Sequence, residues 1–170
     1  MKLIIILSIA GSLLLAACGG GSNIPLPQKN VTLTFSMMSS AHGSAILGID
    51  AFAIIPQGAT VPLVTNTNQI DPASLKGHNN SGQATFGVYS ASTRKIHISV
   101  LATTASGIPF GSIADVTMPV STGVAIGLND FLSLNSVAVP YLNSTLYEIL
   151  AVGGIPQSQV KVTLSATPGF

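Results

Sequence analysis

The sequence is poor in charge, in aromatic rings and in cysteine. Only 6% of its 170 residues are charged, where about 25% is usual for a soluble protein. It has no tryptophan, the ring that most often forms a flat ligand platform, and only three tyrosines. It has one cysteine, so no disulfide can form within the chain and the apolar core must hold the fold without one.

The shortage of charge also limits the partners. One of the six cationic residues is Lys2 near the start of the chain, and the five that follow are balanced by five acids. Without a basic patch we expect no binding of nucleic acid. Serine and threonine supply most of the polarity, which favours an extracellular β-protein because exposed helix faces normally carry Lys and Glu.

The single cysteine follows an apolar run. Residues 3–15, which come directly after Lys2, would span roughly 20 Å as a helix, too short for a hydrocarbon core of about 30 Å. The segment Leu15-Ala16-Ala17-Cys18 resembles the bacterial lipobox. The resemblance implies cleavage between Ala17 and Cys18. It also implies a diacylglycerol group on the Cys18 sulfur and an acyl group on its new amine.

These features divide the chain into three parts. Residues 1–17 are a signal peptide, residues 18–29 are the lipidated cysteine with a flexible tether, and residues 30–170 are one domain. The tether reaches about 17 Å on average, and two or more acyl chains anchor a protein stably. Gly19 follows the cysteine where an aspartate would imply inner-membrane retention. The resemblance therefore favours the bacterial outer membrane, with the lipid on Cys18 as the only attached group and no further cofactor.

The domain shows the pattern of an all-β protein. In residues 31–37 the odd positions are apolar and the even ones carry hydroxyls, as in a half-buried strand. Further strands are expected over residues 48–55, 83–89, 95–101, 110–120, 131–140 and 159–166. A long loop with one turn after Asp71 is expected at 66–82, and a short helix at 144–152. About 8–9 short strands predict an antiparallel β-sandwich of the jelly-roll type.

The order of segments is similar to that of the cohesin family. An alternating strand precedes "ILGIDAFAIIPQGATV", and "KIHISVLATTASGIPFGSIADVTMPV" and "DFLSLNSVAVPYLN" follow a polar loop. The resemblance, which covers most of residues 30–166, implies a cohesin-like jelly roll related in fold to cellulose-binding modules. It also implies a dockerin-like protein partner on one sheet face, with Asp50 among the contacts. Residues 54–58 replace the usual apolar-x-Tyr-Asp segment, which leaves the specificity for dockerins open.

The sequence holds no pattern for catalysis. There is no Gly-x-Ser-x-Gly elbow, and no Cys or His spacing typical of a zinc site. His42, His78 and His97 lie in unrelated segments, and we expect them to be solvated, without the orienting carboxylate that catalysis needs. The five acids are scattered. We therefore expect no enzyme, no catalytic residue and no metal site.

The resulting hypothesis is a non-enzymatic binding module that holds a protein partner near the membrane. One alternative is a carbohydrate-binding lipoprotein, in which Tyr89, Tyr141 and Tyr147 would form an exposed row for a polysaccharide. Another is a structural component of an envelope assembly that pairs through a strand edge. The phenylalanines other than Phe170 are expected in the core.

Overall fold

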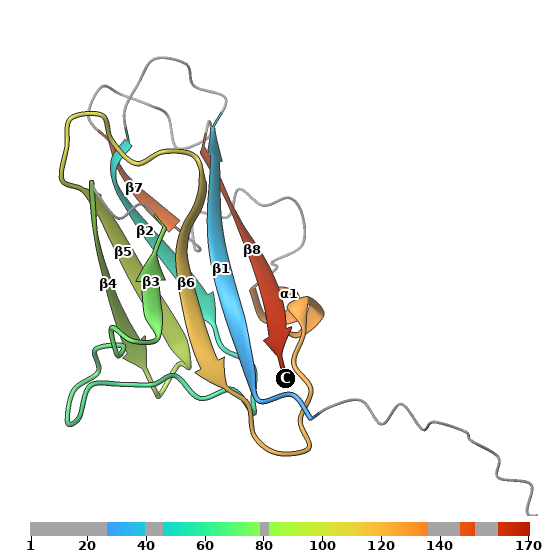
Figure 1. Ribbon diagram of the computed structural model, residues 1–170. Helices are drawn as coiled ribbons and strands as arrows, with labels where there is room; N and C mark the ends of the chain where they lie inside the picture. Colours follow the sequence, from blue (N-terminus) through green and yellow to red (C-terminus); the bar gives the residue numbers. More distant parts are fainter. Residues whose placement is uncertain (1–26, 40–45, 79–81, 136–146, 152–159) are drawn as a thin grey trace, which may run out of the picture.

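Two four-stranded antiparallel sheets face each other in a computed structural model of the chain (Figure 1). The structure describes residues 27–39, 46–78, 82–135, 147–151 and 160–170, with only the backbone for 39 and 147–151. One sheet has the order β3-β6-β1-β8 and the other β4-β5-β2-β7. The strands are β1 (Asn30–Ser39), β2 (Ile46–Ile54), β3 (Leu75–Gly77), β4 (Gln83–Ser90), β5 (Lys95–Ala102), β6 (Gly111–Pro119), β7 (Tyr147–Ala151) and β8 (Val160–Gly169). The predicted all-β antiparallel sandwich is confirmed.

Strand β1 follows the predicted alternation. Val31, Leu33, Phe35 and Met37 are fully buried, while the hydroxyl residues between them lie on the outer face. The strand is central, because β6 pairs with one of its edges and β8 with the other. A sheet with one face on the core and one face in solvent requires this period of two.

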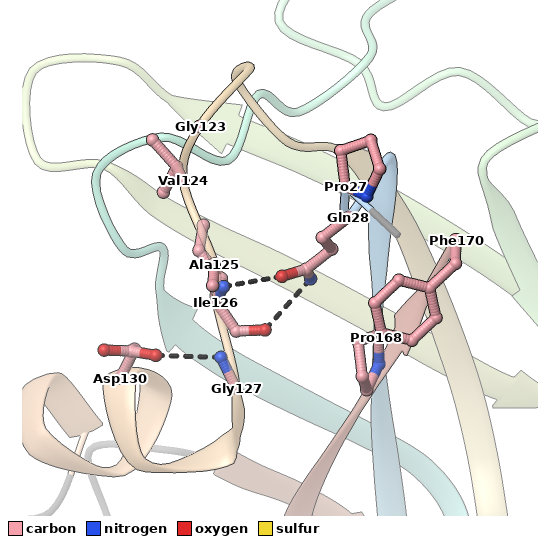
Figure 2. Close-up of a pocket in the computed structure, with 10 residues that line it drawn as sticks. All are labelled: Pro27, Gln28, Gly123, Val124, Ala125, Ile126, Gly127, Asp130, Pro168 and Phe170. Carbon is pink, nitrogen blue, oxygen red and sulfur yellow. Dashed lines mark hydrogen bonds between the residues drawn. The ribbon is translucent and has the colours of Figure 1, made fainter. Parts of the chain in front are cut away.

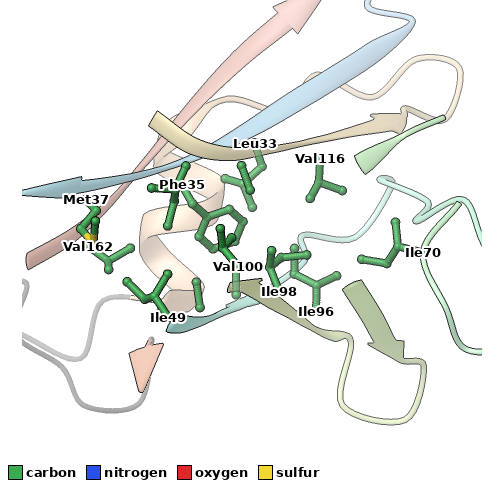
Figure 3. Packing of buried hydrophobic residues seen from close by; sticks show 14 of the residues in the cluster. Leu33, Phe35, Met37, Ile49, Ile70, Ile96, Ile98, Val100, Val116 and Val162 are labelled. Carbon is green, nitrogen blue, oxygen red and sulfur yellow. The ribbon is translucent and has the colours of Figure 1, made fainter. Parts of the chain in front are cut away.

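The core lies between the two sheets (Figure 3). Leu33 and Phe35 of β1 approach Ile96, Ile98 and Val100 of β5 from the opposite layer (Figure 3). These five side chains are completely buried. Burying a large aliphatic or aromatic side chain stabilises the fold by about 1.5–3 kcal/mol, so this cluster holds the sandwich together without a disulfide.

The hairpin of β4 and β5 departs from the expectation that phenylalanines lie in the core. Tyr89 pairs with Ile96 on the inner face, which puts Gly87 on the inner face and Phe86 on the outer one. Phe86 is 54% exposed. Ile70 and Leu75 occupy the space that a side chain at position 87 would take. The expectation is also wrong for exposed Phe110 and for half-buried Phe52, and correct for Phe35 and Phe131.

Two predicted elements have the wrong type. The expected strand at 131–140 begins as helix α1 (Leu128–Asn135), and residues 136–140 lie outside the described part. The Asp130 carboxylate accepts a hydrogen bond from Gly127 N–H at 2.8 Å and so caps the helix start, while Phe131 enters the core. The expected helix at 144–152 contains β7 instead, because this segment pairs with β2.

The long loop after residue 66 is shorter than expected. A hydrogen-bonded turn begins at Asp71, whose carbonyl accepts from Ser74 N–H at 2.8 Å and from Leu75 N–H at 3.1 Å. Strand β3 then pairs with β6 over three residues. The turn that the sequence predicted after Asp71 is present, and the short strand after it was not predicted.

The two ends of the domain meet at one end of the sandwich, which we call the base (Figure 1). Asn30, the first residue of β1, pairs with Gly169 at the end of β8 and with Pro119 at the end of β6. The segment 56–60 joins them, since Thr60 N–H donates to Pro119 O at 3.0 Å. Helix α1 lies beside β8 near this end.

Candidate functional site

The outer face of the β4-β5-β2-β7 sheet exposes apolar side chains. We call this surface the β5 face. Its exposed apolar residues are Ile54, Phe86, Val88 and Leu101, with exposed fractions of 36%, 54%, 39% and 38%. Phe86 and Val88 are successive outward residues of β4, and Leu101 of β5, which pairs with Ala84, lies diagonally across from Phe86. A cluster of exposed apolar groups in a soluble domain indicates an interaction surface.

Polar side chains of β2 and β5 form the centre of the β5 face. Asp50 pairs with Ser99 across the two strands, and the Ser99 hydroxyl donates to Asp50 Oδ1 at 2.5 Å. His97 Nε2 lies 3.1 Å from the same Asp50 oxygen and 3.3 Å from Ser99 Oγ. One carboxylate oxygen therefore holds both a hydroxyl and an imidazole in place.

An aromatic pair extends this cluster toward the base. The rings of Phe52 and His97 stack with their centroids 4.3 Å apart and an interplanar angle of 27°. The ammonium group of Lys95 lies 4.3 Å from the centroid of the Phe52 ring, within the range of a cation–π contact. The imidazole of His97 is thus held by a ring on one side and a carboxylate on its edge.

The expectation of histidines without a carboxylate is wrong for both His78 and His97. His97 contacts Asp50, and His78 Nε2 lies 2.7 Å from Asp115 Oδ2. The His97–Asp50 pair does not have the arrangement of a catalytic relay. In a relay the carboxylate and the nucleophile bind different ring nitrogens, whereas Asp50 and Ser99 both approach Nε2 of His97. His42 lies outside the described residues.

The outer face of the β3-β6-β1-β8 sheet is instead a regular array of hydroxyl groups. We call it the hydroxyl face. Registers of β1 with β6 and β8 give three rows across the sheet, Thr117–Thr32–Thr167, Asp115–Thr34–Ser165 and Ser112–Ser36–Thr163. Thr32 and Thr117 are hydrogen-bonded at 3.0 Å, and the Thr34 hydroxyl donates to Asp115 at 2.6 Å.

The predicted contact residues are only partly brought together. Asp50 lies at the centre of the β5 face, and its role as a contact residue stays a prediction. Tyr89 is partly buried and packs against the core. Tyr141, Ala17 and Cys18 lie outside the described residues, and only the backbone of Tyr147 is described. The expected row of Tyr89, Tyr141 and Tyr147 therefore stays a prediction.

Phe86, Val88 and the pairing of His97 with Asp50 were not predicted. A signal for the first two was present. The alternation of Ile96, Ile98 and Val100 fixes the inner face of β5, and a four-residue turn at 91–94 pairs Tyr89 with Ile96. Because side chains alternate along a strand, this register already places residues 86 and 88 outside.

Over the described ranges, no group of three or more His, Cys, Asp or Glu side chains is arranged to hold a metal ion. Likewise, none of the helices within those ranges combines the length and apolar content needed to cross a membrane. Comparison with known proteins finds no matching family model, no matching curated protein and no matching solved structure.

Proposed function

We propose that this protein is a membrane-anchored lipoprotein whose sandwich domain is a non-enzymatic binding module for a protein partner. The lipid on Cys18 anchors it in the bacterial envelope, in the outer membrane, and the β5 face contacts the partner. The observation that carries the proposal is the group of exposed apolar residues Phe86, Val88 and Leu101 beside the Asp50–Ser99–His97 cluster.

The composition of the β5 face supports a protein partner. The centre of a protein interface is typically depleted of charge and enriched in aromatic residues, with polar groups that fix the orientation. Phe86 supplies an exposed ring, and Val88 and Leu101 extend the apolar area around it. Asp50 and His97 are already oriented by each other, so binding does not need to order them first.

The strand order supports the finer proposal of a cohesin-like jelly roll. The chain passes between the two sheets after β1, β2 and β3, and again after β5, β6 and β7, which is the kind of crossing that a jelly roll requires. The resemblance to cohesins implies a dockerin-like partner that is bound on a sheet face. The β5 face carries both the apolar group and Asp50.

A capture experiment tests the proposal. Residues 23–170 are immobilised and exposed to envelope extract of the source organism, with calcium and with a chelator. The variant Phe86→Ser removes the most exposed ring of the β5 face. The matched control is Phe110→Ser, which removes a ring of similar exposure, 49%, that belongs to neither sheet face.

We expect one partner to be captured by the protein and by Phe110→Ser, and at least about tenfold less by Phe86→Ser. Capture only with calcium, of a protein with dockerin-like repeats, supports the cohesin-like role. Capture regardless of calcium supports a component of an envelope assembly. Equal capture by Phe86→Ser contradicts the β5 face, and no capture contradicts the protein partner.

The hydroxyl face favours carbohydrate as the second candidate. Its three rows present hydroxyl groups, with the Asp115 carboxylate in the middle row, at spacings of about 4.8 Å across the strands and about 6.7 Å along them, a polar lattice suited to hydrogen bonding with a polysaccharide. Pull-down on insoluble polysaccharides tests this candidate. Thr34→Val keeps the shape and removes the central hydroxyl, so retention should fall, whereas Ser99→Ala on the other sheet should change nothing.

A further inference from the structure

The base of the sandwich contains an apolar pocket of about 520 Å³ (Figure 2). Its walls come from three parts of the chain that are distant in sequence. Pro27 and Gln28 form one side, residues 123–127 before α1 form the second, and Pro168 with Phe170 forms the third. Small-molecule pockets usually measure about 300–1,000 Å³, so the space is large enough for an apolar chain.

The polar groups in the lining are already paired within the protein. The Gln28 carboxamide accepts from Ile126 N–H at 2.7 Å and donates to Ile126 O at 3.0 Å. The Asp130 carboxylate accepts from Gly127 N–H, and Figure 2 shows all three bonds. Apart from the exposed Asp130 carboxylate, the side chains that remain for a ligand are apolar, mainly Val124, Pro168 and the ring of Phe170.

Phe170 is the most exposed large apolar side chain among the described residues, at 61%. Its ring stands beside Pro168 on the opposite side of the pocket from Val124 (Figure 2). It has no place in the core cluster. An exposed ring beside an apolar pocket is the arrangement by which a protein surface enters the interfacial region of a bilayer.

The pocket also lies where the tether joins the domain. Residues 19–26 separate Cys18 from Pro27, a length that reaches at most about 30 Å and that, as the flexible tether the sequence predicts, would reach about 17 Å on average. A lipid on Cys18 therefore keeps the base near the membrane at an effective concentration on the order of millimolar. At that concentration the base can contact the membrane even if its affinity is too weak to bind a protein that lacks the lipid anchor.

We propose that the base is a membrane-contact surface, in which Phe170 and the adjoining pocket enter the acyl region of the phospholipid bilayer. This inference rests on the proposed lipid anchor. The base then lies on the membrane and the strands rise from it, because β1 begins and β8 ends there (Figure 1). The β5 face and the hydroxyl face both stay accessible from the aqueous side.

The absence of tryptophan makes the contact measurable. The full-length lipidated protein carries Phe170→Trp as its only tryptophan and is reconstituted into phosphatidylethanolamine–phosphatidylglycerol vesicles with brominated acyl chains. The matched control carries Phe86→Trp on the β5 face, where the replaced ring is also exposed. Flotation of the vesicles reports anchoring, and quenching by bromine reports contact with acyl chains.

We expect both variants to float, with the fluorescence of Phe170→Trp quenched roughly twofold or more and that of Phe86→Trp unchanged. Flotation without quenching of Phe170→Trp overturns the contact and leaves the anchor intact. Equal quenching of both variants also overturns it, since the sandwich would then lie on its side. Failure of both to float overturns the anchor and, with it, the membrane contact.

Discussion

Gln28 and Ile126 are 98 residues apart in the chain and are joined by two hydrogen bonds. The side-chain amide of Gln28 uses both its oxygen and its nitrogen on the N–H and C=O of one residue. This is the bonding that a neighbouring strand would supply. Gln28 Nε2 also donates to Asn30 O at 3.0 Å, so Gln28 holds the start of β1 and the segment before α1 together.

Replacing Gln28 by glutamate should weaken this junction. In Gln28→Glu the carboxylate still accepts from Ile126 N–H, but its second oxygen faces the carbonyls of Ile126 and Asn30 that the amide nitrogen satisfied. We expect the free energy of unfolding to fall by about 1–3 kcal/mol, measured by urea denaturation. Gln57→Glu, at an exposed position, is the control and should stay within about 0.5 kcal/mol. Equal stability of the two variants would show that the junction contributes nothing.

Gly87 is required by its neighbours in the core. A methyl group at this position would lie 2.8 Å from Cδ1 of Ile70, 2.9 Å from Cδ2 of Leu75 and 3.0 Å from Cδ1 of Ile98. Gly87→Ala should therefore lower the free energy of unfolding by about 1–3 kcal/mol through overpacking. Gly127→Ala is the matched control, because a methyl group there meets nothing within 4 Å. If thermal denaturation shows the same Tm for both, the packing around Gly87 is looser than these distances indicate.

The inward and outward residues of a strand were predictable where the strand's own sequence alternates between apolar and polar residues. The alternation in β1 identified its four inward residues, because period two is set by the backbone and not by the neighbours. The predicted type of element was wrong for α1 and β7, where contacts with residues distant in sequence determine the secondary structure. Asn135 is held by the backbone of Ile54 in β2, and β7 pairs with the same strand. Such contacts override local propensity.

Of the residues that form the candidate site on the β5 face, the sequence analysis named only one. Asp50 was named, but its partners Ser99 and His97 depend on the register between β2 and β5, which no local pattern of one strand contains. Phe86 was assigned to the core because phenylalanine is usually buried. Gly87 shows why that rule fails here, since Ile70 and Leu75 already fill the inner space beneath β4.

Asn135 is the buried polar residue of α1, with 7% of its surface exposed. Its amide oxygen accepts from Ile54 N–H at 2.6 Å, and its nitrogen donates to Ile54 O at 2.9 Å and to Phe131 O at 2.8 Å. In Asn135→Asp a buried charge would face these two carbonyls, so we expect a loss of roughly 3 kcal/mol in unfolding free energy. Asn129→Asp is the control. Its side chain is exposed in the first turn of the helix, where an acid is favourable, so a comparable loss there would refute the explanation.

Arg94 closes the β4–β5 hairpin with a φ of 54°, and its carbonyl accepts from Ile55 N–H at 2.8 Å. Asparagine tolerates this left-handed conformation, whereas a β-branched side chain does not. Arg94→Asn should leave the stability unchanged within about 0.5 kcal/mol, and Arg94→Val should reduce it by about 1–2 kcal/mol. Chemical denaturation of the pair measures the difference. A stability order with Arg94→Val above Arg94→Asn would mean that the turn adopts another conformation in solution.

The proposed anchor depends on one sulfur atom. Cys18→Ser removes the thiolate that would carry diacylglycerol, so the protein should move from the membrane to the soluble fraction and lose metabolic labelling with palmitate. Ser22→Ala, a change of similar size within the tether, should leave both properties as they are. Because a single acyl chain binds a membrane only marginally, partial loss of acylation should also release protein. If Cys18→Ser stays on the membrane and the unmodified sequence takes up no label, attachment occurs through another part of the molecule.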